Sequence, residues 1–280
     1  MAAPIVQAGE GSWEFSAAIS DDERRGDPPR RGPANIKEEL AQLLAGLRRG
    51  GLGERAERRG GLGERAERNI DSFFVVADAF EANGLLMQAV DCLEDIAGVL
   101  RSLAAARAGR GEPHGLIETE DDILPYRDCH NIHVVDGNYL TGAQPTEAGY
   151  RWLRSKGVST VINLRLPTDH DRRMVEELGM EHVHIAWPDE QPPSIEQVRE
   201  MLAVVEAAPG RVFQHCLRGI GRDMTMSACY AIASHGQSPS AAIHAGCQHA
   251  PRWAADQQRD AATGQPSQFQ LLHHWAGQLR

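Results

Sequence analysis

The feature that most constrains this 280-residue chain is the stretch 212–222, which reads V-F-Q-H-C-L-R-G-I-G-R. It opens like a short buried strand, turns through Gly219 and Gly221, and continues into a helix-like run over 224–232. In such a unit the backbone N–H groups of the turn meet the N-terminus of the helix. Because free N–H donors and the positive end of the helix dipole coincide there, the turn is predicted to bind an anion.

Two reactive side chains, Cys216 and Arg222, lie at the two ends of this turn with five residues between them. Converging N–H groups, a helix N-terminus and an arginine all stabilise a thiolate. The sequence therefore predicts a Cys216 pKa below the value of ~8.5 for a free cysteine. A thiolate can attack phosphorus and form a covalent intermediate. The planar guanidinium of Arg222 can hold two phosphate oxygens at once.

Residues 215–222 match the pattern H-C-x-x-G-x-x-R, and so resemble the signature of the cysteine-dependent protein tyrosine phosphatase superfamily, in its dual-specificity-like bacterial branch. Two further matches occur upstream, in the family's order. Residues 158–165, V-S-T-V-I-N-L-R, resemble its G-V-x-x-V-I-N-L-R strand, and 187–189, W-P-D, resemble its general-acid loop. The resemblance covers roughly residues 125–255.

This resemblance implies a metal-independent phosphatase that hydrolyses phosphomonoesters of the phosphotyrosine or dual-specificity type through a phosphocysteine intermediate. Cys216 is then the nucleophile, Arg222 the phosphate clamp, and Asp189 the acid that protonates the leaving oxygen and later activates water. His215 is expected to orient the loop and to lower the thiol pKa. The implied substrate-binding residues are those of the loop: His215, Leu217, Arg218, Gly219, Ile220 and Gly221.

Other acidic residues compete with Asp189 for the role of general acid. Glu190 is its neighbour, but Asp189 has the motif position. Asp169 and Asp171, which follow the N-L-R strand, are the reserve candidates.

The chain departs from the family at one position, because Asp223 stands where the family has Ser or Thr. That hydroxyl helps the thiolate to leave when the phosphocysteine is hydrolysed. A carboxylate facing the sulfur would oppose ionisation of Cys216, whereas one facing the helix N-terminus would be favourable as a cap. We expect the second arrangement, and with it slow breakdown of the intermediate.

Other functions remain open at this stage. Arg218 adds a second cation beside the phosphate, which suits an inositol (poly)phosphate phosphatase of the same fold. Asp223 favours a pseudophosphatase that binds phosphorylated ligands. Sulfur transfer would not need the acid at position 189, and arsenate reduction would need a resolving cysteine such as Cys129 or Cys229.

Composition narrows the partners and the compartment. A net charge of −10 argues against a nucleic-acid or anionic-membrane binder and leaves phosphorylated proteins or small polyanionic phosphates as partners. Five scattered cysteines without a C-x-x-C pair, and the absence of a leader or an apolar run of 18 residues, predict a soluble, cytoplasmic protein. No cofactor is implied. No metal is expected either, because the histidines lack partners at ligand spacing: His244, His249, His273 and His274.

The chain is predicted to have three parts. Residues 1–34 read as a disordered tail, 35–110 as a helical region and 116–280 as the phosphatase-like catalytic domain. Within the helical region, residues 49–58 recur unchanged as 59–68, which predicts a solvated linker or, alternatively, a docking arm. Helices are expected over 36–47, 70–82 and 85–105. The last two form a hairpin that pads the catalytic domain or serves as an oligomer contact.

Strands alternate with helices after residue 116, which predicts an α/β fold with a mainly parallel central sheet flanked by helices, as in tyrosine phosphatases. The expected strands are 132–135, 138–141, 158–164, 180–186 and 211–215. Thr146 is expected to cap one helix, and a capping box formed by Ser194 and Gln197 to open another.

Overall fold

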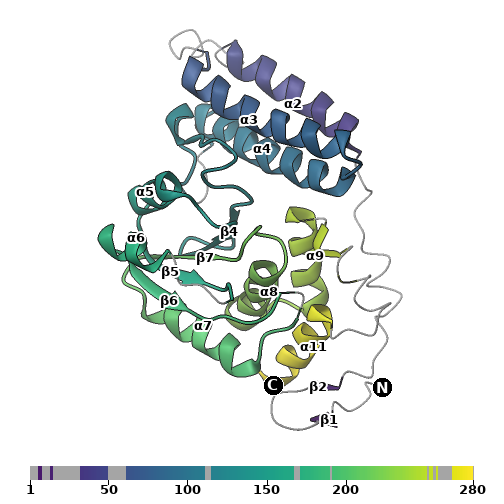
Figure 1. The fold of residues 1–280 in the computed structure, drawn as a ribbon, viewed down its shortest axis with the longest axis vertical. Helices are drawn as coiled ribbons and strands as arrows, with labels where there is room; N and C mark the ends of the chain where they lie inside the picture. Colours follow the sequence, from purple (N-terminus) through teal and green to yellow (C-terminus); the bar gives the residue numbers. More distant parts are fainter. Residues whose placement is uncertain are drawn as a thin grey trace.

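The computed structural model describes residues 6–7, 13–14, 32–49, 61–110, 115–166, 171–189, 191–250, 252–254, 257 and 267–279 (Figure 1). Most of the predicted tail, and the first copy of the tandem repeat after Arg49, lie outside these residues. Two short strands of the tail are described, β1 (Val6–Gln7) and β2 (Trp13–Glu14), which pair antiparallel.

The centre of the fold is a five-stranded sheet of order β3-β4-β7-β5-β6. Its strands are β3 (His133–Val134), β4 (Tyr139–Gly142), β5 (Val158–Asn163), β6 (Glu181–His184) and β7 (Arg211–His215). The strands β4, β7, β5 and β6 are parallel, and only β3 at the edge is antiparallel to its neighbour. The predicted mainly parallel sheet is confirmed.

Helices cover both faces of this sheet because its strands are apolar on both sides. One face carries Leu140, Val161 and Phe213 and packs with α5 (Glu147–Ser155) and α6 (Arg172–Glu177). The other face carries Tyr139, Ile162 and Val212. Its helices are α7 (Ile195–Ala207), α8 (Arg222–His235), α9 (Pro239–His249) and α11 (Gln268–Gln278) (Figure 1).

Two local signals at helix N-termini had different outcomes. The capping box of Ser194 and Gln197 is present at the start of α7, as predicted. Thr146 precedes α5 but makes no capping bond, so that prediction is wrong. Its hydroxyl donates to Oδ1 of Asp128 at 2.9 Å, and this tertiary partner replaces the local one.

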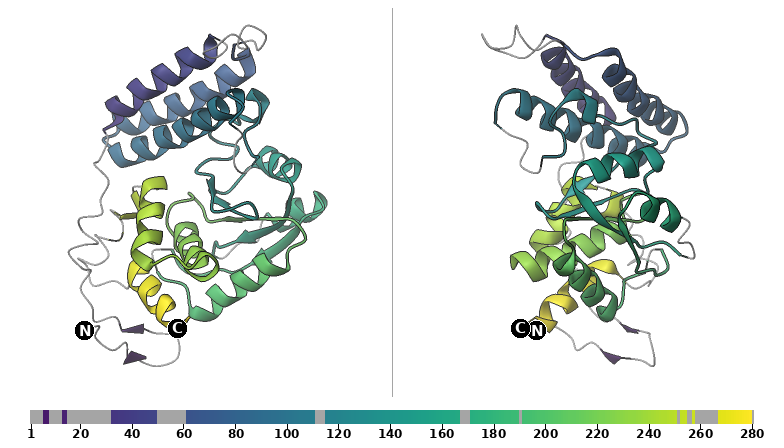
Figure 2. Two further views of the ribbon diagram at one scale, coloured as in Figure 1. Left: turned by 180° about the vertical axis from the view of Figure 1, so that it is seen from behind. Right: turned by 90° about the vertical axis from the view of Figure 1, so that its left-hand side faces the viewer.

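The helical region, residues 32–110, contains α2 (Pro33–Arg48), α3 (Glu64–Ala82) and α4 (Leu86–Arg107), which lie side by side at one end of the molecule (Figures 1 and 2). α3 begins within the second copy of the repeat and buries Ala66. For residues 64–68 the linker prediction is therefore wrong. The sequence E-R-A-E-R consists of strong helix formers, and Gly63 ends the glycine-rich lead before it.

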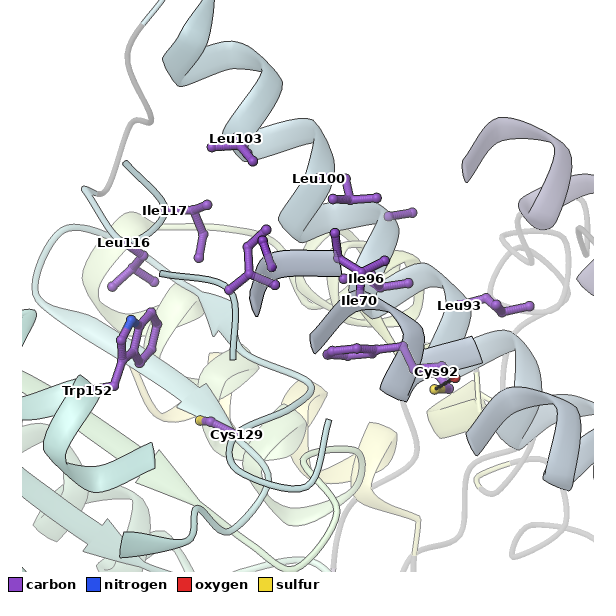
Figure 3. Packing of buried hydrophobic residues seen from close by; sticks show 14 of the residues in the cluster. Ile70, Cys92, Leu93, Ile96, Leu100, Leu103, Leu116, Ile117, Cys129 and Trp152 are labelled. Atoms are coloured by element: carbon purple, nitrogen blue, oxygen red, sulfur yellow. Dashed lines mark hydrogen bonds between the residues drawn. The ribbon is translucent and has the colours of Figure 1, made fainter. Parts of the chain in front are cut away.

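The helical region shares a hydrophobic core with one face of the sheet. Side chains of α4, among them Ile96 and Leu100, belong to the same buried cluster as Leu116, Cys129 and Trp152 (Figure 3). Of the two roles expected for these helices, padding of the sheet is observed, and the oligomer contact stays a prediction. Among the described helices, none combines the length and the apolar character needed to cross a bilayer.

Candidate active site

The nucleophile loop connects β7 to α8, at the carboxyl end of a central parallel strand. Cys216 follows β7 directly and is 4% exposed, and Gly221 precedes the first residue of α8. Gly219 has a φ of 70°, and a Cβ at this position would lie 2.5 Å from the backbone nitrogen of Ala143. Only glycine therefore fits the loop here, for its backbone conformation and for the space available.

The sulfur of Cys216 lies between a backbone donor and a carboxylate. The backbone N–H of Gly219 donates to Sγ at 3.2 Å, as a thiolate-stabilising loop requires. On the other side, Sγ donates to Oδ1 of Asp223, also at 3.2 Å. The expectation that Asp223 turns away from the sulfur is wrong. Asp223 is fully buried in the first turn of α8, and its Oδ2 has no hydrogen-bond partner in the described part of the chain.

Ionisation of Cys216 is opposed in this arrangement. Burial raises the pKa of the thiol well above its ordinary value, and the charge of Asp223 adds to this effect. Arg222 and the backbone N–H of Ile220 act in the opposite direction but do not compensate. The prediction of a lowered thiol pKa is therefore wrong for this structure. Burial also raises the pKa of Asp223, so the two side chains compete for one proton.

Arg222 brings the three sequence motifs together. Arg222 is 4% exposed, and its Nη1 donates to the carbonyl of Leu164 at 3.0 Å and to that of Trp187 at 3.1 Å. Its Nε lies 3.3 Å from Oδ1 of Asp189, whose side chain is 56% exposed. The end of β5, the W-P-D loop and the nucleophile loop therefore meet at this one side chain. Glu190, the competing acid, lies outside the described residues.

His215 lies behind the loop, because its side chain is fully buried. Its Nε2 is 2.9 Å from Oδ2 of Asp171 and 3.1 Å from the hydroxyl of Tyr150. Nδ1 lies 3.1 Å from the carbonyl oxygen of Cys216. These contacts fit the predicted orienting role, and the imidazole lies in the core.

Asp171 is held by four side chains and is not an available acid. Its oxygens accept from Tyr150 and Asn163 at 2.6 and 2.7 Å, and lie 2.9 and 3.1 Å from the Nε2 atoms of His215 and His182. Burial opposes its ionisation, but the histidines and Tyr150 outweigh this and hold the pKa well below the usual carboxyl range. Its role as a reserve acid is therefore wrong. Asp169, the other reserve acid, lies outside the described residues.

The remaining loop residues divide between the open side and the core. Leu217 and Arg218 are exposed, whereas Gly219 and Ile220 are buried. Arg165, the last residue of the N-L-R match, is hydrogen-bonded to the side chain of Gln144, whose backbone N–H donates to the carbonyl of Leu217 in the loop at 3.3 Å. One basic residue, Arg218, therefore belongs to the loop, and a second, Arg165, belongs to a segment beside it.

Some contributors to the site were not identified from the sequence. Asn163 and His182 occupy strand positions that are buried, and both bind Asp171. The signal in the sequence that could have identified them was a polar residue at a strand position expected to be buried. In the described part of the chain, no three His, Cys, Asp or Glu side chains gather as metal ligands.

A buried cysteine beneath a backbone donor, an arginine at the helix start and an acidic loop are the features that the resemblance in the sequence predicts for a phosphate-binding cysteine loop. Residues 130–266 match the family model described as "DSP-PTPase phosphatase fused to NAD+ Kinase". The chain is 30% identical over 114 residues to the tyrosine-protein phosphatase cdc-14 of Caenorhabditis elegans, which covers 41% of this chain and 16% of that protein. It is also 30% identical over 107 residues to the dual specificity phosphatase CDC14A of Mus musculus, covering 38% and 17%. The matched segment, residues 130–266, is thus similar to the dual-specificity phosphatases of the cysteine-dependent protein tyrosine phosphatase superfamily.

The curated relatives are much longer than the matched segment, since the chain spans 16 to 24% of their length. Among solved structures, PTPMT1 is 23% identical, with a TM-score of 0.43, over 53% of this chain and 95% of that one. The core catalytic domain of the PP-IP phosphatase SIW14 from S. cerevisiae is 15% identical, with a TM-score of 0.42, over 47% and 83%.

Proposed function

We propose that this chain is a metal-independent phosphatase that hydrolyses phosphomonoesters through a phosphocysteine intermediate. The observation that carries the proposal is the convergence of Cys216, the Gly219 N–H, Arg222 and Asp189 at the carboxyl end of β7. Donors fixed in place before the reaction stabilise the charge on the phosphate oxygens as it spreads in the transition state.

In the first step the Cys216 sulfur forms a bond to phosphorus while the bond from phosphorus to the leaving oxygen breaks. Asp189, exposed beside the guanidinium, gives its proton to that oxygen. In the second step a water oxygen bonds to phosphorus and the S–P bond breaks. The water proton passes to Asp189, which restores the acid.

The proton of Cys216 needs an acceptor in the first step. Asp223 Oδ1 accepts the S–H hydrogen bond, so it receives this proton as the sulfur attacks. The carboxyl group is then neutral and can donate a hydrogen bond back to the sulfur when the S–P bond breaks. Asp223 thus takes over part of the role of the family's hydroxyl, although its charge makes the thiol harder to ionise.

A pseudophosphatase is the second candidate, and the raised pKa of Cys216 favours it. Such a module would bind phosphate through the loop without turnover. The test is hydrolysis of p-nitrophenyl phosphate by the full chain, with and without EDTA, and by a Cys216→Ser variant. Turnover that survives EDTA and is lost in the variant supports the phosphatase. Phosphate binding without any turnover supports the pseudophosphatase.

For the substrate class we propose a phosphorylated protein or a small polyanionic phosphate, such as an inositol phosphate. Arg218 is exposed in the loop and Arg165 belongs to a segment beside it, so a second anionic group of the substrate would meet a cation. A panel of phosphotyrosine peptide, phosphothreonine peptide and inositol phosphates tests this. Arg218→Ala should lower kcat/KM for the polyanions more than for p-nitrophenyl phosphate.

We also propose a cytoplasmic location. All five cysteines are buried and free, which suits a reducing compartment. A fluorescent fusion of the chain, imaged in cells, tests the location.

A further inference from the structure

One peptide group of the nucleophile loop joins the sulfur to a distant part of the fold. This is the group between Arg218 and Gly219. Its N–H donates to Sγ of Cys216 at 3.2 Å, and its carbonyl accepts from Nδ2 of Asn131 at 2.7 Å. Because a peptide group is planar, holding its carbonyl on one side fixes the direction of its N–H on the other.

Without the hydrogen bond from Asn131, this peptide group would be free to rotate. Gly219, with a φ of 70°, follows it, and glycine tolerates both signs of φ. A rotation would turn the N–H away from Cys216 and direct a carbonyl oxygen toward the sulfur or a bound phosphate. The Asn131 side chain is placed to oppose that rotation.

Asn131 itself is in an unusual backbone conformation. Its φ is 52°, and it is the one residue other than glycine with positive φ in the described part of the chain. Its side chain is buried, and its Cβ would lie 2.9 Å from a Cβ added at Gly219. Asparagine tolerates this left-handed region better than most residues, but the conformation still needs support from its surroundings.

Part of that support comes from the helical region. The backbone N–H of Asn131 donates to Oδ2 of Asp95 at 2.8 Å, and Asp95 belongs to α4. The preceding residue is also fixed, since the carbonyl of His130 accepts from the backbone N–H of Ala143 at 3.0 Å. Ala143 in turn forms a backbone bridge with Arg218. The contacts therefore run from α4 through Asn131 to the peptide group beneath the sulfur.

We infer that Asn131 and Asp95 are positioning residues that hold the 218–219 peptide group with its N–H toward Cys216, so that the helical region helps to set the phosphate-binding conformation of the loop. The inference rests on the proposed phosphatase function. It assigns to α4 a part in substrate binding that goes beyond padding the core.

The test compares variants of the full chain with a matched control. Asn131→Asp keeps the size of the side chain and its tolerance of positive φ, but replaces the donor with an oxygen that repels the Arg218 carbonyl. Asp95→Ala removes the acceptor on α4, and Asp95→Asn keeps an oxygen there. Glu94→Gln, the neighbouring carboxylate on α4, pairs with Arg101 and serves as the control.

Two readouts are measured: the affinity for inorganic phosphate by calorimetry in a Cys216→Ser background, and KM and kcat for p-nitrophenyl phosphate. We expect Asn131→Asp and Asp95→Ala each to weaken phosphate binding and to raise KM about three- to tenfold, the effect of one lost hydrogen bond. Asp95→Asn should recover most of the loss, and Glu94→Gln should match the parent. A variant that combines Asn131→Asp with Asp95→Ala should lose less phosphate affinity than the product of the two single losses, because both residues act on the same peptide group.

Unchanged phosphate affinity in Asn131→Asp and Asp95→Ala overturns the inference, as does an equal loss in Glu94→Gln. If Asp95→Ala fails to fold, Asp95→Ser replaces it, and Asn131→Asp decides independently. Failure of the proposed function gives a different result. The parent chain would then show no turnover, while the calorimetry on Cys216→Ser would still report whether the two residues control phosphate binding.

Discussion

Cys216 donates a hydrogen bond from Sγ to Oδ1 of Asp223 over 3.2 Å, and both side chains are buried. The nucleophile of a cysteine phosphatase is expected to be ionised, yet here its proton is held by a carboxylate. In the proposed mechanism, the charge of Asp223 should therefore slow the formation of the phosphocysteine, whereas during its breakdown Asp223 is already protonated and donates a hydrogen bond to the sulfur.

Three forms of position 223 should separate these two steps. In the parent chain we expect the formation of the phosphocysteine to be the slow step, so that rapid mixing with p-nitrophenyl phosphate gives no burst of product. Asp223→Asn removes the charge but supplies no hydroxyl, so it should show a burst followed by slow turnover. Asp223→Thr removes the charge and supplies the hydroxyl, so it should raise the steady-state rate about ten- to a hundredfold. A Thr variant slower than the parent would show that proton acceptance by Asp223 speeds the reaction more than the negative charge of Asp223 slows it.

Alkylation by iodoacetamide reports the thiol pKa independently of turnover. Removing the charge of Asp223 lowers the pKa of Cys216, and each unit raises the thiolate fraction about tenfold at a pH below the pKa. Both Asp223→Asn and Asp223→Thr should react faster than the parent at pH 7, with Cys216→Ser as the control for the other cysteines. Equal rates in all three forms would mean that burial alone sets the reactivity of the thiol.

Stability should also depend on Asp223, and in an unusual direction. Its pKa is raised in the folded chain, so the folded state holds a proton that the unfolded state releases at lower pH. Stability from this group is therefore present at acid pH and is lost as pH rises through the raised pKa. Asp223→Asn should melt about 2–4 °C higher than the parent at pH 8, for ~1 kcal/mol of relief, and the gain should shrink toward pH 5. A gain that is the same at both pH values would exclude the carboxylate charge as the cause.

The structural features that the sequence predicted correctly are those that short sequence patterns determine. The strand that delivers Cys216 was predicted with the bounds that β7 has, because apolar residues end at a glycine-containing turn. The capping box before α7 was also accessible because it depends on a few neighbouring residues, and the mainly parallel sheet was accessible because strands alternate with helices along the chain.

The orientation of Asp223 could not be predicted in the same way. The Asp223 carboxylate could face either the N-terminus of α8 or the Cys216 thiol, and its orientation depends on how α8 packs against the sheet. The contacts of Asn131 with Arg218 and with Asp95 join residues 87 and 36 positions apart, so only the folded chain brings them together. The same holds for the donors that surround Asp171.

The general-acid assignment predicts a dependence on the leaving group. Asp189→Asn should lower kcat about a hundred- to a thousandfold for an alkyl phosphate, whose leaving oxygen needs a proton. The loss should be smaller for p-nitrophenyl phosphate, because that leaving group is stable as an anion. Glu200→Gln, an exposed carboxylate on α7, is the control. An equal loss for both substrates would show that Asp189 acts mainly through its ion pair with Arg222.

Asp171 should be the residue of this site on which stability depends most. Its carboxylate accepts from Tyr150 and Asn163 and contacts the rings of His182 and His215, all in the core. Asp171→Asn places an amide N–H₂ among these donors, so we expect a loss of about 1–3 kcal/mol in the free energy of unfolding. Because the pKa of Asp171 is depressed, its contribution is fully present above the ordinary carboxyl pKa near ~4 and is lost progressively as pH falls from there toward the depressed pKa.

Urea unfolding between pH 7 and pH 3 measures this contribution. The difference between the parent and Asp171→Asn should be largest at pH 7 and should narrow as the pH is lowered, whereas the exposed Asp121→Asn should follow the parent throughout. kcat/KM should fall together with stability in Asp171→Asn, because His215 loses the oxygen that orients it beneath Cys216. A variant as stable and as active as the parent at pH 7 would mean that Tyr150 alone is sufficient to hold the His215 ring.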